Sequence, residues 1–445
     1  MTDEDARGFD TDAIHAGYGG DPASGAPVPP IHQTTSYAFE DADDAAARYA
    51  LESDENIYSR ISNPTVKALE DRLAALSNAA GAVATASGMA AFDAATFVLA
   101  AAGDNVVSAE SIYGGTRAYL SHNASRRGIE ARFVDTLDLD AYREAIDEDT
   151  AFVHLETIGN PSLVVPDIEA VADVAHEHGV PLVVDNTFAT PALCRPLEHG
   201  ADVVWHSTTK WLHGSGTTLG GVLLDGGDFD WDGYAEISEP NPAYHGMVLG
   251  ERFPDAPFAA AVRHRATRSL GNAQKPFDAW QTIQGLETLP LRIDRHCENA
   301  RIVADYLDDH DDVAWVNYPG LDDHATHGNA ERYLDGGYGG MVSFGLEGVR
   351  GSDAPASEEE GSASDSGFDA GRRLCESADL ASFLANVGDA KTLVIHPAST
   401  THAQLSEEEQ LAAGVPRDLV RLSVGIEDPE DILADLDRAI AEATR

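Results

Sequence analysis

The sequence contains very few lysines. Of its 445 residues only four are lysine, at positions 67, 210, 275 and 391, and 29 basic residues face 76 acidic ones. The formal net charge of −47 would repel nucleic acid and anionic membranes, which argues against both as partners. A salt-rich cytoplasm favours such a composition because salt screens the self-repulsion. We therefore expect a halophilic protein; an acidic surface that is simply well solvated is the alternative.

Cysteine and long apolar runs are scarce too. Cys194, Cys297 and Cys375 are odd in number and far apart, which favours reduced thiols in a cytoplasm over a disulfide framework. No pair of them has the close spacing of zinc ligands. No apolar run reaches the roughly 18 residues that a membrane helix needs, and the acidic N-terminus does not resemble a signal peptide. We expect a cytoplasmic protein with no metal site and no membrane span.

Short valine-rich runs alternate with helical patterns between about residues 80 and 226. The runs expected to form strands are 81–87, 104–110, 131–136, 151–157, 181–186, 201–207 and 220–226. Their apolar residues are continuous rather than alternating, which is typical of strands buried on both faces. Helical patterns such as 89–102 and 168–178 lie between them. The sequence therefore predicts an α/β fold with a mostly parallel seven-stranded sheet flanked by helices.

The pattern changes on either side of this region. We expect residues 1–70 to form a loop-like N-terminal arm, residues 71–285 to form the large domain, and residues 286–445 to form a smaller C-terminal α+β domain. The segment 351–371 is poor in apolar residues and rich in Ser, Gly and acidic residues. It is expected to be a disordered surface loop of the last domain.

Lys210 stands in a place that suggests chemistry. It follows the expected strand 201–207 and precedes glycine-rich turns in "STTKWLHGSG". Ligands of parallel α/β sheets bind at the carboxyl ends of the strands, and a lysine there can form a Schiff base with an aldehyde cofactor. Pyridoxal 5'-phosphate is the cofactor that fits this use.

Other residues at expected strand ends supply what pyridoxal phosphate needs. Asp185 could keep the pyridine nitrogen protonated, and Tyr113 could cover the ring. The phosphate requires N–H groups at a helix start together with hydroxyls; the candidates are Ser87, Gly88, Met89, Ser207 and Thr209. Each residue alone has an ordinary explanation, since Asp185 could cap a helix, Tyr113 could be a packing residue, and a Ser-Gly pair could be a turn. Their shared position at strand ends favours the cofactor site.

Eight motifs in order give the chain a family resemblance. They are "YSRISNPT", "ASGMAA", "YGGT", "VVDNTFATP", "HSTTKW", "QGLETLPLR", "HPASTTH" and "RLSVGIE". Together they resemble the Cys/Met-metabolism family of fold type I pyridoxal phosphate enzymes, over nearly the whole chain. The resemblance implies the fold type I transferase architecture and a homo-oligomer, typically a tetramer. It also implies that residues 1–70 contribute to the site of the neighbouring subunit.

The resemblance implies a role for each cofactor residue. Lys210 would bind pyridoxal phosphate covalently and later transfer protons, and Tyr113 would stack on the ring. Asp185 would pair with the pyridine nitrogen, and Asn160 would lie near the phenolic oxygen. The residues implied to surround the phosphate are Ser87, Gly88, Met89, Ser207 and Thr209.

Four further residues receive roles by resemblance. Tyr58 and Arg60 would reach the cofactor phosphate of the neighbouring subunit. Arg421 would bind the substrate α-carboxylate, for which a guanidinium fork suits better than an ammonium. Asn386 would lie beside that carboxylate.

Within the family, the chain is most similar to the O-acetylhomoserine sulfhydrylases. The segments 241–271 and 385–410 are typical of that branch, and Gly115 stands where methionine γ-lyases have a reactive cysteine. The similarity implies that sulfide replaces the acetate of O-acetyl-L-homoserine to give L-homocysteine for methionine biosynthesis. Cystathionine γ-synthase or γ-lyase activity is one alternative, and an inactive paralogue that serves as a binding subunit is another. The preference for an acetyl or succinyl ester and the role of Lys275 stay open.

Overall fold

The computed structural model describes residues 7–347, 362–404 and 406–445. Its larger sheet has seven strands in the order β1-β7-β6-β5-β4-β2-β3. They are β1 (Gly81–Thr85), β2 (Asn105–Ala109), β3 (Glu130–Val134), β4 (Thr150–Glu156), β5 (Leu182–Asp185), β6 (Val203–His206) and β7 (Gly221–Asp225). All pairs are parallel except those of β7, which runs antiparallel to β1 and β6. The predicted sheet and its seven strands are confirmed.

Helices cover both faces of this sheet, because every residue of β2, β4, β5, β6 and β7 is buried. The helices that precede and connect its strands are α3 (Pro64–Leu76), α4 (Gly88–Leu99), α5 (Gly114–Ala118), α6 (Leu139–Ala145), α7 (Ile168–Glu177) and α8 (Thr190–Leu193). Those that follow β7 are α9 (Ala235–Ser238), α10 (Leu249–Arg252), α11 (Pro257–Ala261), α12 (Arg268–Leu270) and α13 (Pro276–Leu286). The helices predicted at 89–102 and 168–178 correspond to α4 and α7.

The smaller sheet has five strands in the order β10-β11-β12-β9-β8. They are β8 (Val313–Asn317), β9 (Met341–Leu346), β10 (Ser382–Phe383), β11 (Leu393–Ile395) and β12 (Leu419–Ser423). Its helices are α14 (Leu289–Asp308), α15 (His327–Tyr333), α16 (Ser362–Ser377), α17 (Glu407–Ala412) and α18 (Pro429–Ala443). This sheet has its own hydrophobic core, separate from that of the larger sheet, as expected for a second α+β domain.

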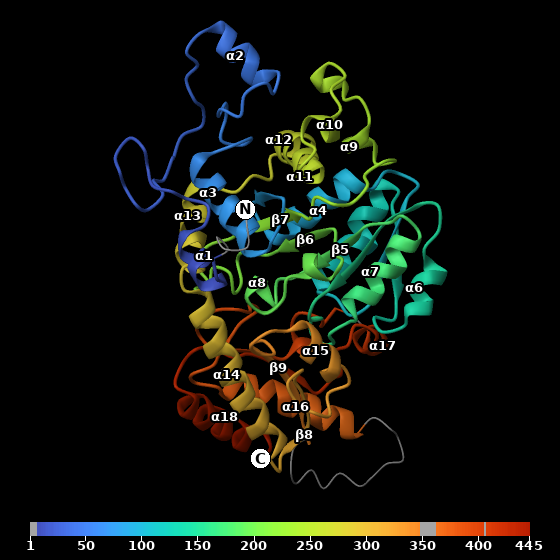
Figure 1. Cartoon of the computed structure of the whole chain (residues 1–445). Coiled ribbons are helices and arrows are strands. Elements are labelled where there is room, and N and C mark those ends of the chain that lie inside the picture. The colour runs from blue at the N-terminus through green and yellow to red at the C-terminus, as the bar shows by residue number, and fades with distance from the viewer. Residues whose placement is uncertain (1–6, 348–361, 405) are drawn as a thin grey trace.

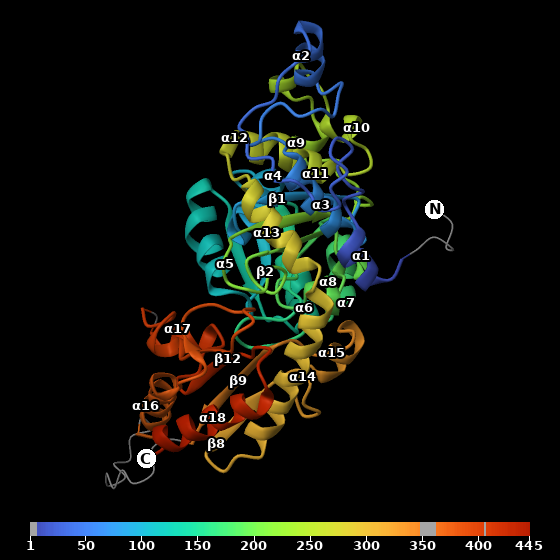
Figure 2. The same ribbon diagram turned by 90° about the vertical axis from the view of Figure 1, so that its left-hand side faces the viewer.

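Helix α14 connects the two cores. Leu289 and Ile293 in its first half pack into the core of the larger sheet. Val303 and Leu307 in its second half pack into the core of the smaller sheet. Figures 1 and 2 show α14 running from the larger sheet down along the smaller one.

The N-terminal arm extends away from the larger sheet, where α2 stands at the top of Figure 1. Between the two short helices α1 (Phe9–His15) and α2 (Ala42–Tyr49), the chain has no regular helix. The arm is therefore mostly loop-like, as predicted, and the two short helices are additions to that prediction.

The predicted disordered loop 351–371 needs a correction. Residues 351–361 lie outside the described residues, but α16 begins at Ser362, so a loop is wrong for 362–371. Ala370 is fully buried, and a Cβ atom on Gly371 would lie 3.2 Å from the side chain of Val420. The buried face of α16 thus uses glycine and alanine at close packing distance. A composition of small and acidic residues concealed this face.

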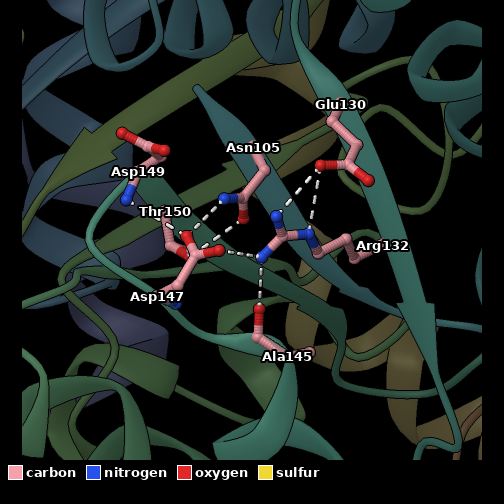
Figure 3. A network of polar contacts seen from close by, with 7 residues as sticks. All are labelled: Asn105, Glu130, Arg132, Ala145, Asp147, Asp149 and Thr150. Carbon is pink, nitrogen blue, oxygen red and sulfur yellow. Dashed lines mark hydrogen bonds and ion pairs between the residues drawn. The ribbon is translucent and has the colours of Figure 1, made fainter. Parts of the chain in front are cut away.

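A polar network holds the amino-terminal ends of β2, β3 and β4 (Figure 3). Asp147 accepts hydrogen bonds from Asn105 at 2.8 Å and from the Arg132 guanidinium at 2.6 Å. These two partners lower the pKa of the Asp147 carboxyl to about 2. Arg132 also donates to the carbonyl of Ala145 and pairs with Glu130. The network occupies the end of the sheet opposite to the predicted site, so its role is structural.

Candidate functional site

A cavity of about 900 Å³ lies at the carboxyl ends of the larger sheet's strands, between the two sheets. Every predicted site residue except Tyr58 and Arg60 lines it: Ser87, Gly88, Met89, Tyr113, Asn160, Asp185, Ser207, Thr209, Lys210, Asn386 and Arg421. The larger sheet and its loops contribute most of them. Asn386 and Arg421 come from the smaller sheet's side, so the cavity needs both domains.

Lys210 lies in the turn that follows β6. Its Nζ atom donates a hydrogen bond to Oδ1 of Asn386 at 2.5 Å. Burial and the positive charge of Arg421 lower the pKa of the Lys210 amine to about 8. A larger fraction of this amine is neutral near neutral pH than for an exposed lysine, and the neutral form is the nucleophile and the base.

Two carboxyl groups end neighbouring parallel strands in this cavity. Asp185 ends β5 and Glu156 ends β4, and the two are register partners. Burial raises the pKa of Asp185 to about 7, and burial together with the charge of Asp185 raises the pKa of Glu156. The sequence analysis missed Glu156, although it closes an apolar run just as Asp185 does.

The amino-terminal end of α4 forms the other side of the cavity. Ser87 caps the helix by accepting a hydrogen bond from the Ala90 N–H at 3.1 Å. A Cβ atom on Gly88 would lie 2.8 Å from the Cβ atom of Ser207. Glycine at position 88 therefore lets the helix start approach the loop that carries Ser207 and Thr209. This brings helix N–H groups and hydroxyls together, as a phosphate site requires.

Arg421 is the residue of β12 that enters the cavity. Its Nη1 atom donates to Oδ1 of Asn160 at 2.9 Å, and burial lowers its pKa to about 10. The side chain keeps its positive charge at neutral pH. A guanidinium with free donors in an enclosed cavity can bind a carboxylate.

Tyr58 and Arg60 lie outside the cavity. The Tyr58 side chain is 41% exposed, and the Arg60 guanidinium carbon lies 5.3 Å from the centre of its ring. Arg60 also donates to the backbone carbonyl of Arg268. Neither residue can reach the cavity of its own chain from this position, so their role toward a neighbouring subunit stays a prediction.

The lining residues fit pyridoxal phosphate. Lys210 provides an amine of lowered pKa, Asp185 a buried carboxyl group, and the start of α4 a phosphate cradle that a side chain at position 88 would fill. No metal site competes with this interpretation, because the described residues contain no group of three or more His, Cys, Asp or Glu side chains that could hold an ion.

Comparison with known proteins agrees with this geometry. The model of the Cys/Met metabolism PLP-dependent enzyme family matches residues 10–441. The chain belongs to this family. Members depend on pyridoxal phosphate, so the predicted cofactor is confirmed, as is the fold type I architecture.

Several similar family members have names that state an activity. A homocysteine synthase of Schizosaccharomyces pombe is 46% identical over 98% of both chains. The O-acetyl-L-homoserine sulfhydrylase 1 of Thermus thermophilus is 46% identical over 97% of this chain and all of its own. A crystal structure of a Campylobacter jejuni protein, assigned as an O-acetylhomoserine (thiol)-lyase, is 40% identical with a TM-score of 0.91 and covers 98% of this chain and 100% of that one. That protein carries a pyridoxyl-lysine phosphate.

The described part of the chain contains no helix that is both long and apolar enough to cross a membrane.

Proposed function

We propose that this protein replaces the acetate of O-acetyl-L-homoserine by sulfide, which yields L-homocysteine and acetate. The observation that carries the proposal is the meeting of Lys210 with Arg421 and Asn386 in one cavity. The names and identities of the relatives support the choice of substrate.

Each step assigns work to a residue of this chain. Bound pyridoxal phosphate would supply an electron sink for negative charge next to the substrate amine. Arg421 would hold the α-carboxylate through its guanidinium fork. The neutral amine of Lys210 would take the proton from the substrate Cα and later return it. Asn386 would keep Nζ in place by accepting its hydrogen bond.

The cofactor would be held from three sides. Asp185 would hold the pyridine nitrogen, and Tyr113 would cover the ring. Asn160 would lie near the phenolic oxygen, and the start of α4 with Ser207 and Thr209 would bind the phosphate. Loss of acetate from Cγ and addition of sulfide at the same carbon then complete the replacement.

We also propose a homotetramer that acts in a salt-rich cytoplasm. Tyr58 and Arg60 would complete the cavity of the neighbouring subunit, which makes a dimer the smallest active unit. The acidic, lysine-poor composition supports the salt-rich setting. The three cysteines are free and buried, which is compatible with a reducing compartment.

Turnover of two esters with two sulfur nucleophiles tests the function. The purified protein in molar salt is given O-acetyl- or O-succinyl-L-homoserine with either sulfide or L-cysteine, and the products are identified by mass spectrometry. We expect L-homocysteine from O-acetyl-L-homoserine and sulfide as the fastest reaction, and loss of at least about a thousandfold in Lys210→Ala because its base is gone. Cystathionine formed from cysteine as the main product would instead assign a γ-synthase. No turnover of either ester would favour the inactive paralogue.

A further inference from the structure

Glu156 is a carboxyl group that the proposed reaction leaves without a task. It is only 5% exposed and lines the cavity at the end of β4. Burying a carboxyl group is costly unless hydrogen bonds compensate. The partners of Glu156 therefore indicate why it is there.

The two oxygens of Glu156 hold two different loops. Oε1 accepts the backbone N–H of Tyr113 at 2.6 Å, in the loop between β2 and α5. Oε2 accepts the backbone N–H of Asn160 at 3.1 Å, in the loop that follows β4. One side chain thus sets the backbone positions of two residues whose side chains belong to the site.

The two loops also contact each other directly. A Cβ atom on Gly159 would lie 2.9 Å from the carbonyl oxygen of Ser111, so only glycine permits this approach. The hydroxyls of Ser111 and Ser162 are hydrogen-bonded to each other. A displacement of one loop is therefore transmitted to the other, and Glu156 binds both.

The loops lead to opposite functions of the cavity. Tyr113 is the residue proposed to cover the cofactor ring, whereas Asn160 accepts the hydrogen bond of Arg421, the residue proposed to bind the substrate carboxylate. We infer that Glu156 is a positioning residue that sets the ring cover and the carboxylate arginine together, through the backbones of Tyr113 and Asn160. This inference rests on the proposed function for the meaning of the two ends, while the contacts stand independently of it.

Glu156→Gln is the direct test, and Glu70→Gln is the matched control. Glutamine has one acceptor oxygen, so its NH₂ group would face one of the two N–H donors and break that bond. Glu70 is equally buried, at 2% exposed, and accepts the Ala84 N–H at 2.9 Å and Arg263 at 2.7 Å. It does not line the cavity. Both variants lose a buried carboxylate with two bonds, but only one of them touches the site loops.

We expect Glu156→Gln to raise KM for O-acetyl-L-homoserine about tenfold, which corresponds to about 1.4 kcal/mol. The visible circular dichroism of the bound cofactor should change, because the ring cover moves, and the affinity for pyridoxal phosphate should fall. Glu70→Gln should lower the melting temperature and leave these three readouts unchanged. Ser162→Ala, which removes the contact between the loops and keeps Glu156, should shift the dichroism in the same direction by less.

A Glu156→Gln protein that behaves like Glu70→Gln, with a lower melting temperature alone, would overturn the inference. If Glu156→Gln does not fold, unchanged dichroism and KM in Ser162→Ala would overturn it instead. Dichroism and cofactor affinity do not depend on the substrate. They therefore test Glu156 even if the turnover assay rejects the proposed function.

Discussion

Enclosure of the Lys210 amine changes the pH at which it can react. The pKa of about 8 lies below the ordinary 10.5 because the cavity removes water and Arg421 adds positive charge. Lys210 is therefore protonated below about pH 8 and neutral above it. The neutral amine is needed both to bind an aldehyde and to accept a proton.

This pKa predicts a pH profile for cofactor attachment. In the cofactor-free protein, pyridoxal phosphate bound covalently to Lys210 and trapped by borohydride should increase with pH through a midpoint near 8. Arg421→Gln removes a positive charge, so its midpoint should move to higher pH. Arg117→Gln, which lines the same cavity, is the control and should leave the midpoint in place. Peptide mass spectrometry measures the trapped fraction, and a wild-type midpoint near 10.5 would contradict the argument.

Single residues differ in how far the sequence revealed them. Lys210 and Asp185 could be found from their position after apolar runs, because such runs mark buried strands whose ends form sites. Glu156 has the same position, but the chemistry of the cofactor assigns it no task, so nothing drew attention to it. Arg421 and Asn386 come from the other sheet, and only the family resemblance pointed to them.

Elements were predictable where one kind of residue dominated. The valine-rich runs identified all seven strands of the larger sheet, because only strands covered on both faces tolerate uninterrupted apolar residues. Helix α16 failed this test, since its packing depends on the absence of side chains at Gly371 rather than on apolar ones. The antiparallel direction of β7 could not be read from its composition, because both directions bury the same residues.

The N-terminal arm yields a prediction from subunit mixing. If Arg60 serves the neighbouring subunit, an Arg60→Ala and Lys210→Ala hybrid dimer has one intact site and one doubly defective site. Random mixing of the two inactive proteins should therefore restore about one quarter of wild-type activity in a twofold dimer. Turnover after denaturation and joint refolding measures the recovery.

Tyr58→Phe mixed with Arg60→Ala is the control for this experiment. Both substitutions lie on the same arm, so every mixed site keeps one defect and activity should not recover. Equal recovery in the two mixtures, or full activity of a monomer in sedimentation, would refute the shared site.

At the scale of the whole molecule, charge dominates. The 29 basic residues cannot neutralise 76 acidic ones, and the unpaired surplus repels itself and any second copy. Repulsion acts over roughly 30 Å at 0.01 M salt but only about 3 Å at 1 M salt. Contacts between subunits should therefore weaken in dilute buffer before the fold of each chain does.

We predict that dilution of salt abolishes activity before it unfolds the chain. Between 2 M and 0.01 M KCl, turnover and cofactor absorption should fall together with the sedimentation coefficient, while far-ultraviolet circular dichroism persists to lower salt. Sucrose at matched osmolality should not restore activity, because it does not screen charge. An assembled and fully active oligomer at 0.01 M salt would remove the halophilic interpretation.

The position of the cavity between two sheets divides its tasks between two separately packed parts of the chain. Lys210 and Asp185 belong to the larger sheet, and Asn386 and Arg421 to the smaller one. A substitution in the smaller sheet can alter which amino acid is admitted while the end proposed to hold the cofactor stays as it was. Related enzymes built on this plan can therefore diverge in substrate without having to reinvent their chemistry.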